Sequence, residues 1–155
     1  ALFGHRYIND PIELEARLED IIGDLIKSKS YIEFLIGRNG DFDRCASSAI
    51  SRMKKKYDYS NAFHVLVLPY PTAEYLNNEK YFEDYYDEIE ICQASASAHF
   101  KASIGIRNRE IVDRADLIIC SVENKSGGAF QALKYAESQN KTIINIFSCK
   151  KEITL

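Results

Sequence analysis

The chain has 155 residues, of which 46% are hydrophobic and 28% are charged, and it has a formal net charge of -3 and a pI of about 5.7. This balance is typical of one globular domain over residues 1–155 and argues against nucleic acid as the main partner. No apolar run reaches the roughly 18 residues that a membrane span needs, and no signal peptide is recognisable. We therefore expect a cytoplasmic protein with no membrane partner. Because Ala1 lies in what reads as a strand already under way, we also expect a short N-terminal piece to be missing.

The cysteines and histidines bear on whether the chain forms disulfides or binds a metal. The four cysteines lie far apart and form no C-x-x-C pair: Cys45, Cys92, Cys120 and Cys149. We expect buried free thiols in a reducing compartment rather than disulfides. The three histidines are not paired with cysteines at zinc-ligand spacing, so no metal site is expected.

The first half of the chain reads as alternating strands and helices. A strand is expected over residues 1–3, followed by a helix that Pro11 opens, since the missing N–H of proline costs nothing there. A second strand is expected at 31–36 and a helix at 43–57, whose basic end suits the helix dipole. A third strand at 62–68 is stopped by prolines.

The second half continues the alternation less regularly. The acidic, tyrosine-rich stretch 72–87 is expected to be a loop with a short helix, and the small polar residues 93–99 a flexible loop. Strands are expected at 88–92, 116–122 and 142–147, and helices at 100–114 and 127–139. Unbroken β-branched runs in the strands are typical of a sheet covered on both faces. The sequence thus predicts a three-layer, doubly wound, mostly parallel, Rossmann-like α/β fold.

Ligands of such sheets bind beyond the carboxyl ends of the strands, so the loops that follow the strands are the candidates for a binding site. The turn Ser126-Gly127-Gly128 opens a predicted helix, where glycines allow a close approach and free N–H groups favour an anion. Ser126 is a candidate N-cap or phosphate donor. A plain strand-to-helix turn is the alternative, because neither G-x-G-x-x-G nor the P-loop pattern occurs.

Two further loops carry suitable groups. After the second strand, Gly37 to Gly40 includes Asn39, and Asp43 follows as either a helix cap or an acceptor for ribose hydroxyls. After the first strand, Gly4-His5-Arg6 offers an imidazole that can titrate or hydrogen-bond and a guanidinium fork suited to phosphate. A surface histidine and arginine are the alternative reading.

The helix expected at 100–114 contains Arg107-Asn108-Arg109 near its middle. Charged side chains at such positions are usually solvated, and the spacing favours that interpretation. The alternative is that this polar group reaches over the rim of the sheet to the same ligand.

In chain order, these segments resemble the YpsA-like branch of the SLOG superfamily. Phe3-Gly4-His5-Arg6 resembles its F-T-G-H-R opening, and residues 107–119 resemble its R-N-R-x-x-V-D-x-x-D-x-x-I segment. Residues 126–136 resemble its P-G-G-T-x-x-x-x-x-Y-A segment, and residues 79–92 its acidic, aromatic stretch before the fourth strand. The resemblance implies a Rossmann-like fold for nucleotides or nucleotide-derived ligands. It also implies kinship with cytokinin-activating phosphoribohydrolases and DprA-like proteins, and a homodimer.

Departures from the family pattern bear on activity. The first loop is one residue shorter, and the turn at 37–40 is more polar. The phosphoribohydrolases carry P-G-G-x-G-T-x-x-E, whose Glu assists cleavage of the N-glycosidic bond. Here the aligned positions hold Phe130, Gln131 and Lys134, so that carboxylate is missing.

Three functions follow as hypotheses. The favoured one is a sensor or carrier module that binds a nucleotide and requires no further cofactor. The alternatives are an N-glycosidic hydrolase or transferase, with Asp43, Glu110 or Asp113 as carboxylate and His5 as acid, and a protein-interaction domain using residues 81–86. The predicted ligand-binding residues are Gly4, His5, Arg6, Gly37, Asn39, Gly40, Asp43, Arg107, Asn108, Arg109, Asp113, Ser126, Gly127 and Gly128.

Overall fold

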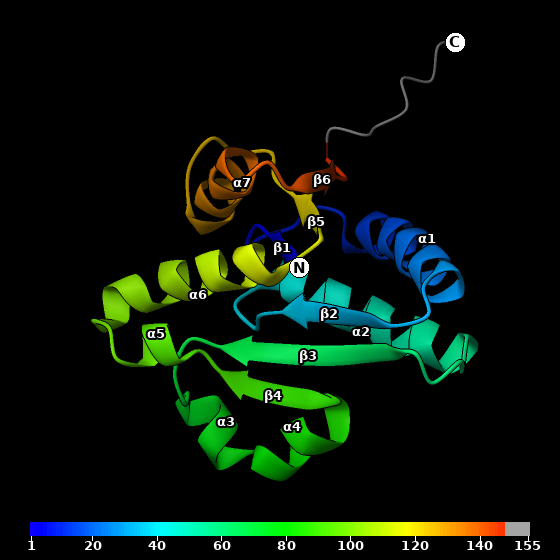
Figure 1. Ribbon diagram of the computed structural model, residues 1–155, viewed down its shortest axis with the longest axis horizontal. Coiled ribbons are helices and arrows are strands. Elements are labelled where there is room, and N and C mark those ends of the chain that lie inside the picture. The colour runs from blue at the N-terminus through cyan, green and yellow to red at the C-terminus, as the bar shows by residue number, and fades with distance from the viewer. Residues whose placement is uncertain (148–155) are drawn as a thin grey trace.

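The computed structural model describes residues 1–147 as parallel strands flanked by helices (Figure 1). The strands are β1 (Leu2–Gly4), β2 (Ile32–Ile36), β3 (Ala62–Leu68), β4 (Glu88–Ile91), β5 (Leu117–Ser121) and β6 (Thr142–Asn145). The helices are α1 (Pro11–Ser28), α2 (Asp41–Lys56), α3 (Ala73–Asn77), α4 (Glu79–Tyr85), α5 (Gln93–Ala96), α6 (Phe100–Arg114) and α7 (Gly128–Ser138).

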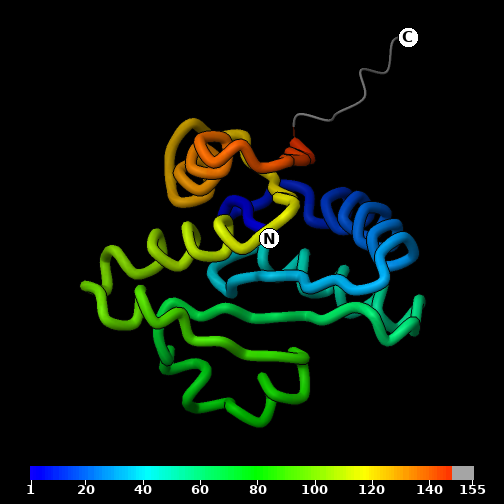
Figure 2. The backbone as a smooth tube through the Cα atoms, in the orientation of Figure 1, coloured from blue at the N-terminus to red at the C-terminus, as the bar shows by residue number. Residues whose placement is uncertain are grey.

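The strands form two three-stranded parallel ladders, β1-β5-β6 and β2-β3-β4. Leu2 pairs with Ile119 in the first ladder, and Phe34 pairs with His64 in the second. The central strands β1 and β2 lie side by side, but within residues 1–147 no ladder pairing joins them. The chain therefore winds outward from β1 to β4 and then returns to place β5 on the other side of β1. Figure 2 follows this return along the chain through α5 and α6.

Two helical layers enclose the strands. Helices α1 and α2 pack against each other on one side, and α6 packs against α7 on the other (Figure 1). The apolar face of α1 buries Leu18 and Ile22 completely, and α2 buries Phe42 and Ile50 completely. This arrangement, with helices on both faces of parallel strands, confirms the predicted three-layer Rossmann-like fold.

Local capping fixes where the long helix α1 begins. The Asp10 side chain accepts a hydrogen bond from the Glu13 N–H at 3.0 Å, and Pro11 occupies the first helical position. The Asp10 carboxylate thus satisfies one first-turn N–H, and Pro11 has no N–H that would need a partner. The loop after β1 therefore enters α1 in one defined direction.

The structure differs from the predicted elements in three places. Residues 72–87 form two helices, α3 and α4, in place of one short helix. The prediction of a flexible loop over 93–99 is wrong, because α5 forms there and the buried Ser95 hydroxyl donates to the carbonyls of Pro69 and Cys92. Helix α2 begins at Asp41 rather than Asp43.

The cysteines agree with the prediction as far as they are described. Cys45, Cys92 and Cys120 are buried free thiols, while Cys149 lies outside the described residues.

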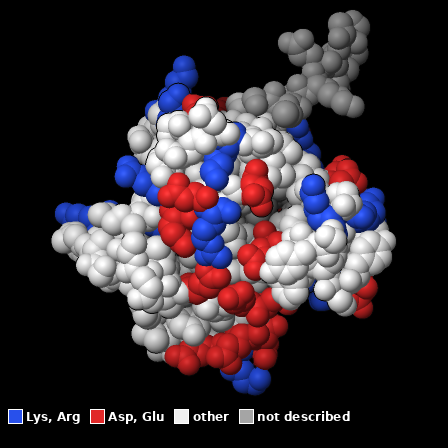
Figure 3. Space-filling view, in the orientation of Figure 1, with Lys and Arg blue, Asp and Glu red and all other residues white. Residues whose placement is uncertain are grey.

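In the described part of the chain, no helix combines the length and the apolar character that crossing a bilayer requires. Figure 3 shows acidic side chains gathered along the lower edge of one face, in the region of α3, α4 and β4.

Candidate functional site

A cleft of about 330 Å³ opens at the carboxyl ends of the strands, where the loops after β1, β2 and β5 meet the middle of α6. Strand order reverses at β1, so this is the place where doubly wound folds bind ligands. Its volume lies in the usual range of small-molecule sites. Twelve of the fourteen predicted site residues line it: Gly4, His5, Arg6, Gly37, Asn39, Gly40, Asp43, Arg107, Asn108, Ser126, Gly127 and Gly128.

The imidazole of His5 joins the β1 loop to the β5 loop. Its Nε2 accepts hydrogen bonds from the backbone N–H groups of Glu123 and Asn124, at 2.9 and 3.0 Å. Nε2 is therefore the unprotonated nitrogen. Partial burial lowers the pKa of His5, although the Glu123 carboxylate acts in the opposite direction. This histidine is held in its neutral form by the loop it organises.

The β1 loop is also fixed to the start of α2. The Asp41 N–H donates to the Arg6 carbonyl at 2.8 Å, and the Asp41 carboxylate accepts from the Ile8 N–H at 3.1 Å. A Cβ at Gly40 would lie 2.6 Å from the Arg6 Cα, so only glycine allows this approach. One wall of the cleft is thus built from two backbones in direct contact.

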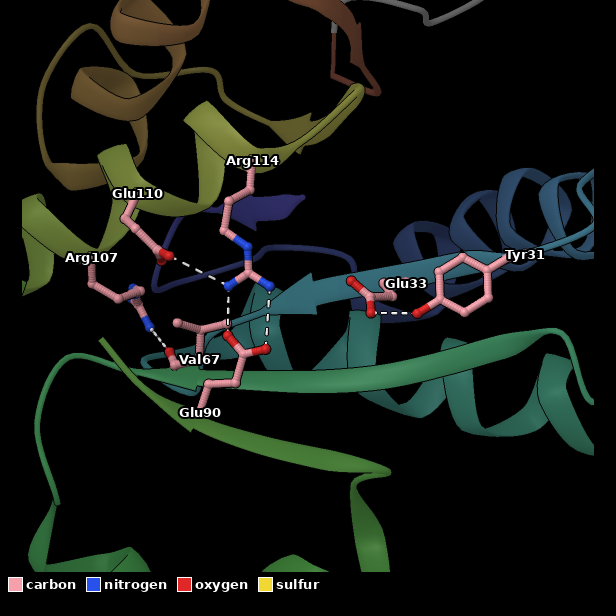
Figure 4. Close-up of polar contacts among 7 residues, drawn as sticks. All are labelled: Tyr31, Glu33, Val67, Glu90, Arg107, Glu110 and Arg114. Atoms are coloured by element: carbon pink, nitrogen blue, oxygen red, sulfur yellow. Dashed lines mark hydrogen bonds and ion pairs between the residues drawn. The ribbon is translucent and has the colours of Figure 1, made fainter. Parts of the chain in front are cut away.

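Arg107 is buried, and the prediction that the middle of α6 would be solvated is wrong for this residue. Its side chain is 3% exposed and donates to the Val67 carbonyl at 2.7 Å and the Asn108 side-chain oxygen at 3.0 Å. Figure 4 shows it reaching from α6 to the end of β3. A Cβ at Gly37 would lie 2.7 Å from Nη1 of Arg107, which explains the glycine there.

The charge of Arg107 is only partly compensated. Burial lowers its pKa, and the charges of Asp43 and Glu110 act against this shift. Among residues 1–147, no carboxylate lies within ion-pair distance of it, and both of its acceptors are neutral. A buried cation of this kind is electrostatically incomplete.

Asp43 is the one carboxylate among the described residues that line the cleft. Its Oδ2 accepts from the Asn39 N–H at 2.8 Å, so it stabilises the turn that precedes α2. Burial raises its pKa, while the Asn39 N–H and the charge of Arg107 lower it. The half-buried carboxyl therefore lies in the electric field of a cation at the wall of the cleft.

Helix α7 presents its first turn to the cleft. Gly127 is its N-cap, with a φ of +89°, a conformation that favours glycine, and no side chain caps the helix. The prediction of Ser126 as N-cap is therefore wrong. A Cβ added at Gly127 or Gly128 would meet nothing within 4 Å. The first turn of α7, whose N–H groups have no partner within the helix, therefore borders open space at the cleft.

Three predicted residues lie outside the cleft. Asp113 accepts a hydrogen bond from the Tyr135 hydroxyl at 2.6 Å, and the Arg109 guanidinium lies 5.5 Å from the centre of the same ring. Glu110, a catalytic candidate, forms an ion pair with Arg114 at 3.4 Å (Figure 4). These side chains join α6 to α7, or stay beside their own helix, instead of facing a ligand.

Sequence reasoning missed several lining residues, including Tyr7, Ile104 and Asn124. Ile104 could have been found, because positions 104, 107, 108 and 111 share one face of a helix. Tyr7 directly follows the predicted Arg6, but nothing in its type or spacing marks it. Among the described residues, no group of three or more potential metal-ligating side chains occurs.

Comparisons with known proteins address the fold. No family model and no curated protein matches this sequence. The solved structure of DNA processing protein A (DprA) from Streptococcus pneumoniae is similar, with a TM-score of 0.63 at 14% identity. The match covers 92% of this chain and 47% of that one, so this chain spans about half the length of its structural relative. At this identity the likeness shows a shared fold, and it confirms the expected DprA-like, Rossmann-like architecture.

Proposed function

We propose that the cleft binds a nucleotide or nucleotide-derived ligand and that the chain acts as a sensor or carrier of that ligand. The motif order that resembles the YpsA-like branch supports the same proposal, since its segments supply the walls of this cleft.

The observation that carries the proposal is the burial of Arg107 without a carboxylate partner at ion-pair distance. This residue is 3% exposed and lines the cleft, and its guanidinium has only neutral hydrogen-bond acceptors. An anionic group in the cleft would complete the electrostatics that the protein leaves open. Phosphate suits this position because a guanidinium can donate two parallel bonds to it.

Two other features supply phosphate donors. The first turn of α7 offers backbone N–H groups beside Gly127 and Gly128, at the positive end of an 11-residue helix. The exposed side chain of Arg6 lines the same cleft. A phosphate between these groups would be neutralised from several sides.

Other polar groups remain for the ribose and base. In this proposal the Asp43 carboxylate accepts from ribose hydroxyls, and the Asn108 amide contacts hydroxyls or the base edge. His5 positions the β5 loop by accepting hydrogen bonds from two backbone N–H groups. A role for His5 as general acid is disfavoured, since its Nε2 is already occupied as an acceptor.

Cleavage of an N-glycosidic bond is a second candidate, and it depends on Asp43. This carboxylate lines the cleft, and burial raises its pKa toward the range of an acid–base group. Lys134, where the phosphoribohydrolases have glutamate, is exposed and pairs with Glu137 at 3.1 Å. Release of free base from nucleoside monophosphates, abolished in Asp43→Asn, would establish this activity. An amount equal to the protein-free blank would reject it.

Gly128 offers a sharp test of binding. Its surroundings are open, so Gly128→Asp places a carboxylate at the anion position without a clash, and an acidic residue in the first turn suits the helix. We expect nucleoside monophosphates to raise the melting temperature of the wild-type protein and to have no effect on Gly128→Asp.

Gly128→Asn is the matched control, with the same shape and no charge, and it should retain most of the shift. A broad nucleotide panel at millimolar concentration that leaves the wild-type melting temperature unchanged would refute the proposal. Equal shifts in wild type and Gly128→Asp would mean that the anion lies elsewhere.

A further inference from the structure

The cleft contains an aromatic side chain that the fold itself does not use. Tyr7 is 82% exposed, the highest value among the exposed aromatic residues, and it lines the cleft. Most other exposed rings have aromatic neighbours, such as Tyr31 on Phe63 at 5.3 Å and Phe100 on His99 at 4.8 Å between ring centres. Within residues 1–147 no ring contact involves Tyr7, and its packing contributes little to the core.

The backbone around Tyr7 is nevertheless fixed. Its two neighbours are both bound to Asp41, since the Arg6 carbonyl accepts from the Asp41 N–H and the Ile8 N–H donates to the Asp41 carboxylate. His5 holds the other side of the loop through the backbone N–H groups of Glu123 and Asn124, which follow β5. The ring is therefore presented on a constrained loop, which lowers the entropy lost when a ligand packs on it.

The polar groups in the cleft fall into two chemical kinds. Arg107 and the first turn of α7 suit an anion. Asn39, Asn108 and Asn124 are neutral amides, and the oxygen of Asn108 already accepts a hydrogen bond from Arg107. Asn39 and Asn124 each offer a donor and an acceptor. The Asn39 and Asn124 amide groups make no hydrogen bond in the described part of the chain, since only their backbone N–H groups are engaged. A phosphate accepts only, so it would leave the amide oxygens unmatched, whereas the edge of a heterocyclic base has both donors and acceptors.

We infer that Tyr7 is the base-binding residue of this site, stacking on the planar heterocycle of the ligand while the amides contact its edge. The inference rests on the proposed function, because it assigns the part of the nucleotide that the phosphate-binding groups leave free. Tyr7 thereby determines specificity for ligands with a base over simple sugar phosphates.

The test compares AMP with ribose 5-phosphate by calorimetric titration of wild type, Tyr7→Ala and Tyr7→Phe. Stacking of one base on an aromatic ring corresponds to about 10- to 100-fold in affinity. We expect Tyr7→Ala to weaken AMP binding by that factor and to leave ribose 5-phosphate binding unchanged. Tyr7→Phe keeps the ring and should bind AMP like wild type.

Tyr31→Ala is the matched control, because Tyr31 is also exposed but precedes β2 at the opposite end of the strand, and it should affect neither ligand. If wild type binds both ligands and Tyr7→Ala weakens them equally, or weakens neither, the inference is overturned and the proposed function stands. AMP binding no tighter than ribose 5-phosphate binding in wild type also overturns it. Wild type that binds neither ligand overturns the proposed function and the inference together.

Discussion

Among residues 1–147, two basic side chains are buried in very different surroundings, Arg107 at the cleft and His64 beneath α4. His64 is 1% exposed, shares a hydrogen bond with Ser47, and has the rings of Tyr85 and Tyr86 against it at 5.6 and 4.7 Å. Arg107 is 3% exposed but lines an open cleft. A buried basic side chain can therefore belong either to the closed core or to a binding site. The groups that surround it distinguish the two cases.

The two residues also differ in charge. Burial lowers the pKa of His64 to about 4, with the charge of Lys54 acting in the same direction and that of Asp87 against it. His64 is therefore neutral at pH 7 and needs no counter-ion. Arginine remains charged in proteins, so the environment of Arg107 has to tolerate a cation. We expect His64 to govern stability and Arg107 to govern binding.

The largest expected effect concerns the pH dependence of stability. The pKa of His64 is about 6.5 unfolded and about 4 folded, so between these values the unfolded state binds more protons. The contribution of His64 to the free energy of unfolding should reach its full value above pH 6.5. The free energy of unfolding should fall by about 3 kcal/mol as the pH decreases to 4. Urea unfolding at several pH values measures this fall.

The control for that experiment is His64→Gln, which keeps a hydrogen-bonding side chain and leaves Asp87 in place. Asp87, whose pKa is lowered chiefly by its Lys54 hydrogen bond against the effect of burial, also loses stabilisation in acid. The difference between the two proteins isolates His64. Parallel curves for wild type and His64→Gln would show that this residue is not buried as a neutral base.

Arg107→Met should separate binding from stability. Loss of a charged hydrogen-bonding group should weaken nucleotide binding by about 30-fold. The free energy of unfolding should change little, because removal of an incompletely paired buried charge offsets the loss of the donor to the Val67 carbonyl. Calorimetric titration and urea unfolding of one preparation measure both. A large loss of stability with unchanged affinity would place Arg107 in the same structural class as His64.

A smaller effect is expected from Gly37→Ala. The added Cβ would lie 2.7 Å from the Arg107 guanidinium, so the side chain has to move, at a cost of about 1–2 kcal/mol. Nucleotide affinity should decrease in the same variant. Gly105→Ala is a matched control, because a Cβ there meets nothing within 4 Å. Equal behaviour of the two variants would argue against close packing at position 37.

The smallest effect concerns Ser47, which lies beside His64 and outside the cleft. Ser47→Ala removes the 3.1 Å hydrogen bond to His64 and should destabilise the protein by about 1 kcal/mol without changing nucleotide affinity. Chemical unfolding together with titration checks both expectations. Weakened binding in this variant would show that the two regions are coupled.

Much of the fold could be predicted from the sequence because its strands are continuous apolar runs between clear turn residues. The apolar runs at β3 and β5 are compatible with little other than strands. The loops after β1, β2 and β5 could be identified as candidates because they follow strands. Helix α5 could not be predicted, because its small polar residues have weak preferences and a long-range bond from Ser95 to the Pro69 carbonyl fixes it.

The site was predicted less completely for a related reason. Arg107 and Arg109 are equivalent in sequence, but two residues correspond to more than half a turn of helix, so they lie on different faces of α6. Which face meets the cleft depends on the packing of α6 beside β3, with Gly37 leaving room for one guanidinium. Tertiary packing therefore determines which arginine lies at the cleft, and the spacing of residues in the sequence does not reveal it.

Within the described residues no ladder joins β1 to β2, and this has a mechanical consequence. The two halves of the strand system are joined there by packing and by the Arg6–Asp41 and Ile8–Asp41 bonds, and the cleft lies across the same seam. A ligand that binds Gly127 on one half and Asn39 on the other would bridge this seam. Binding would then restrict the movement of the two halves relative to each other, so the stiffness of the whole domain would depend on occupancy.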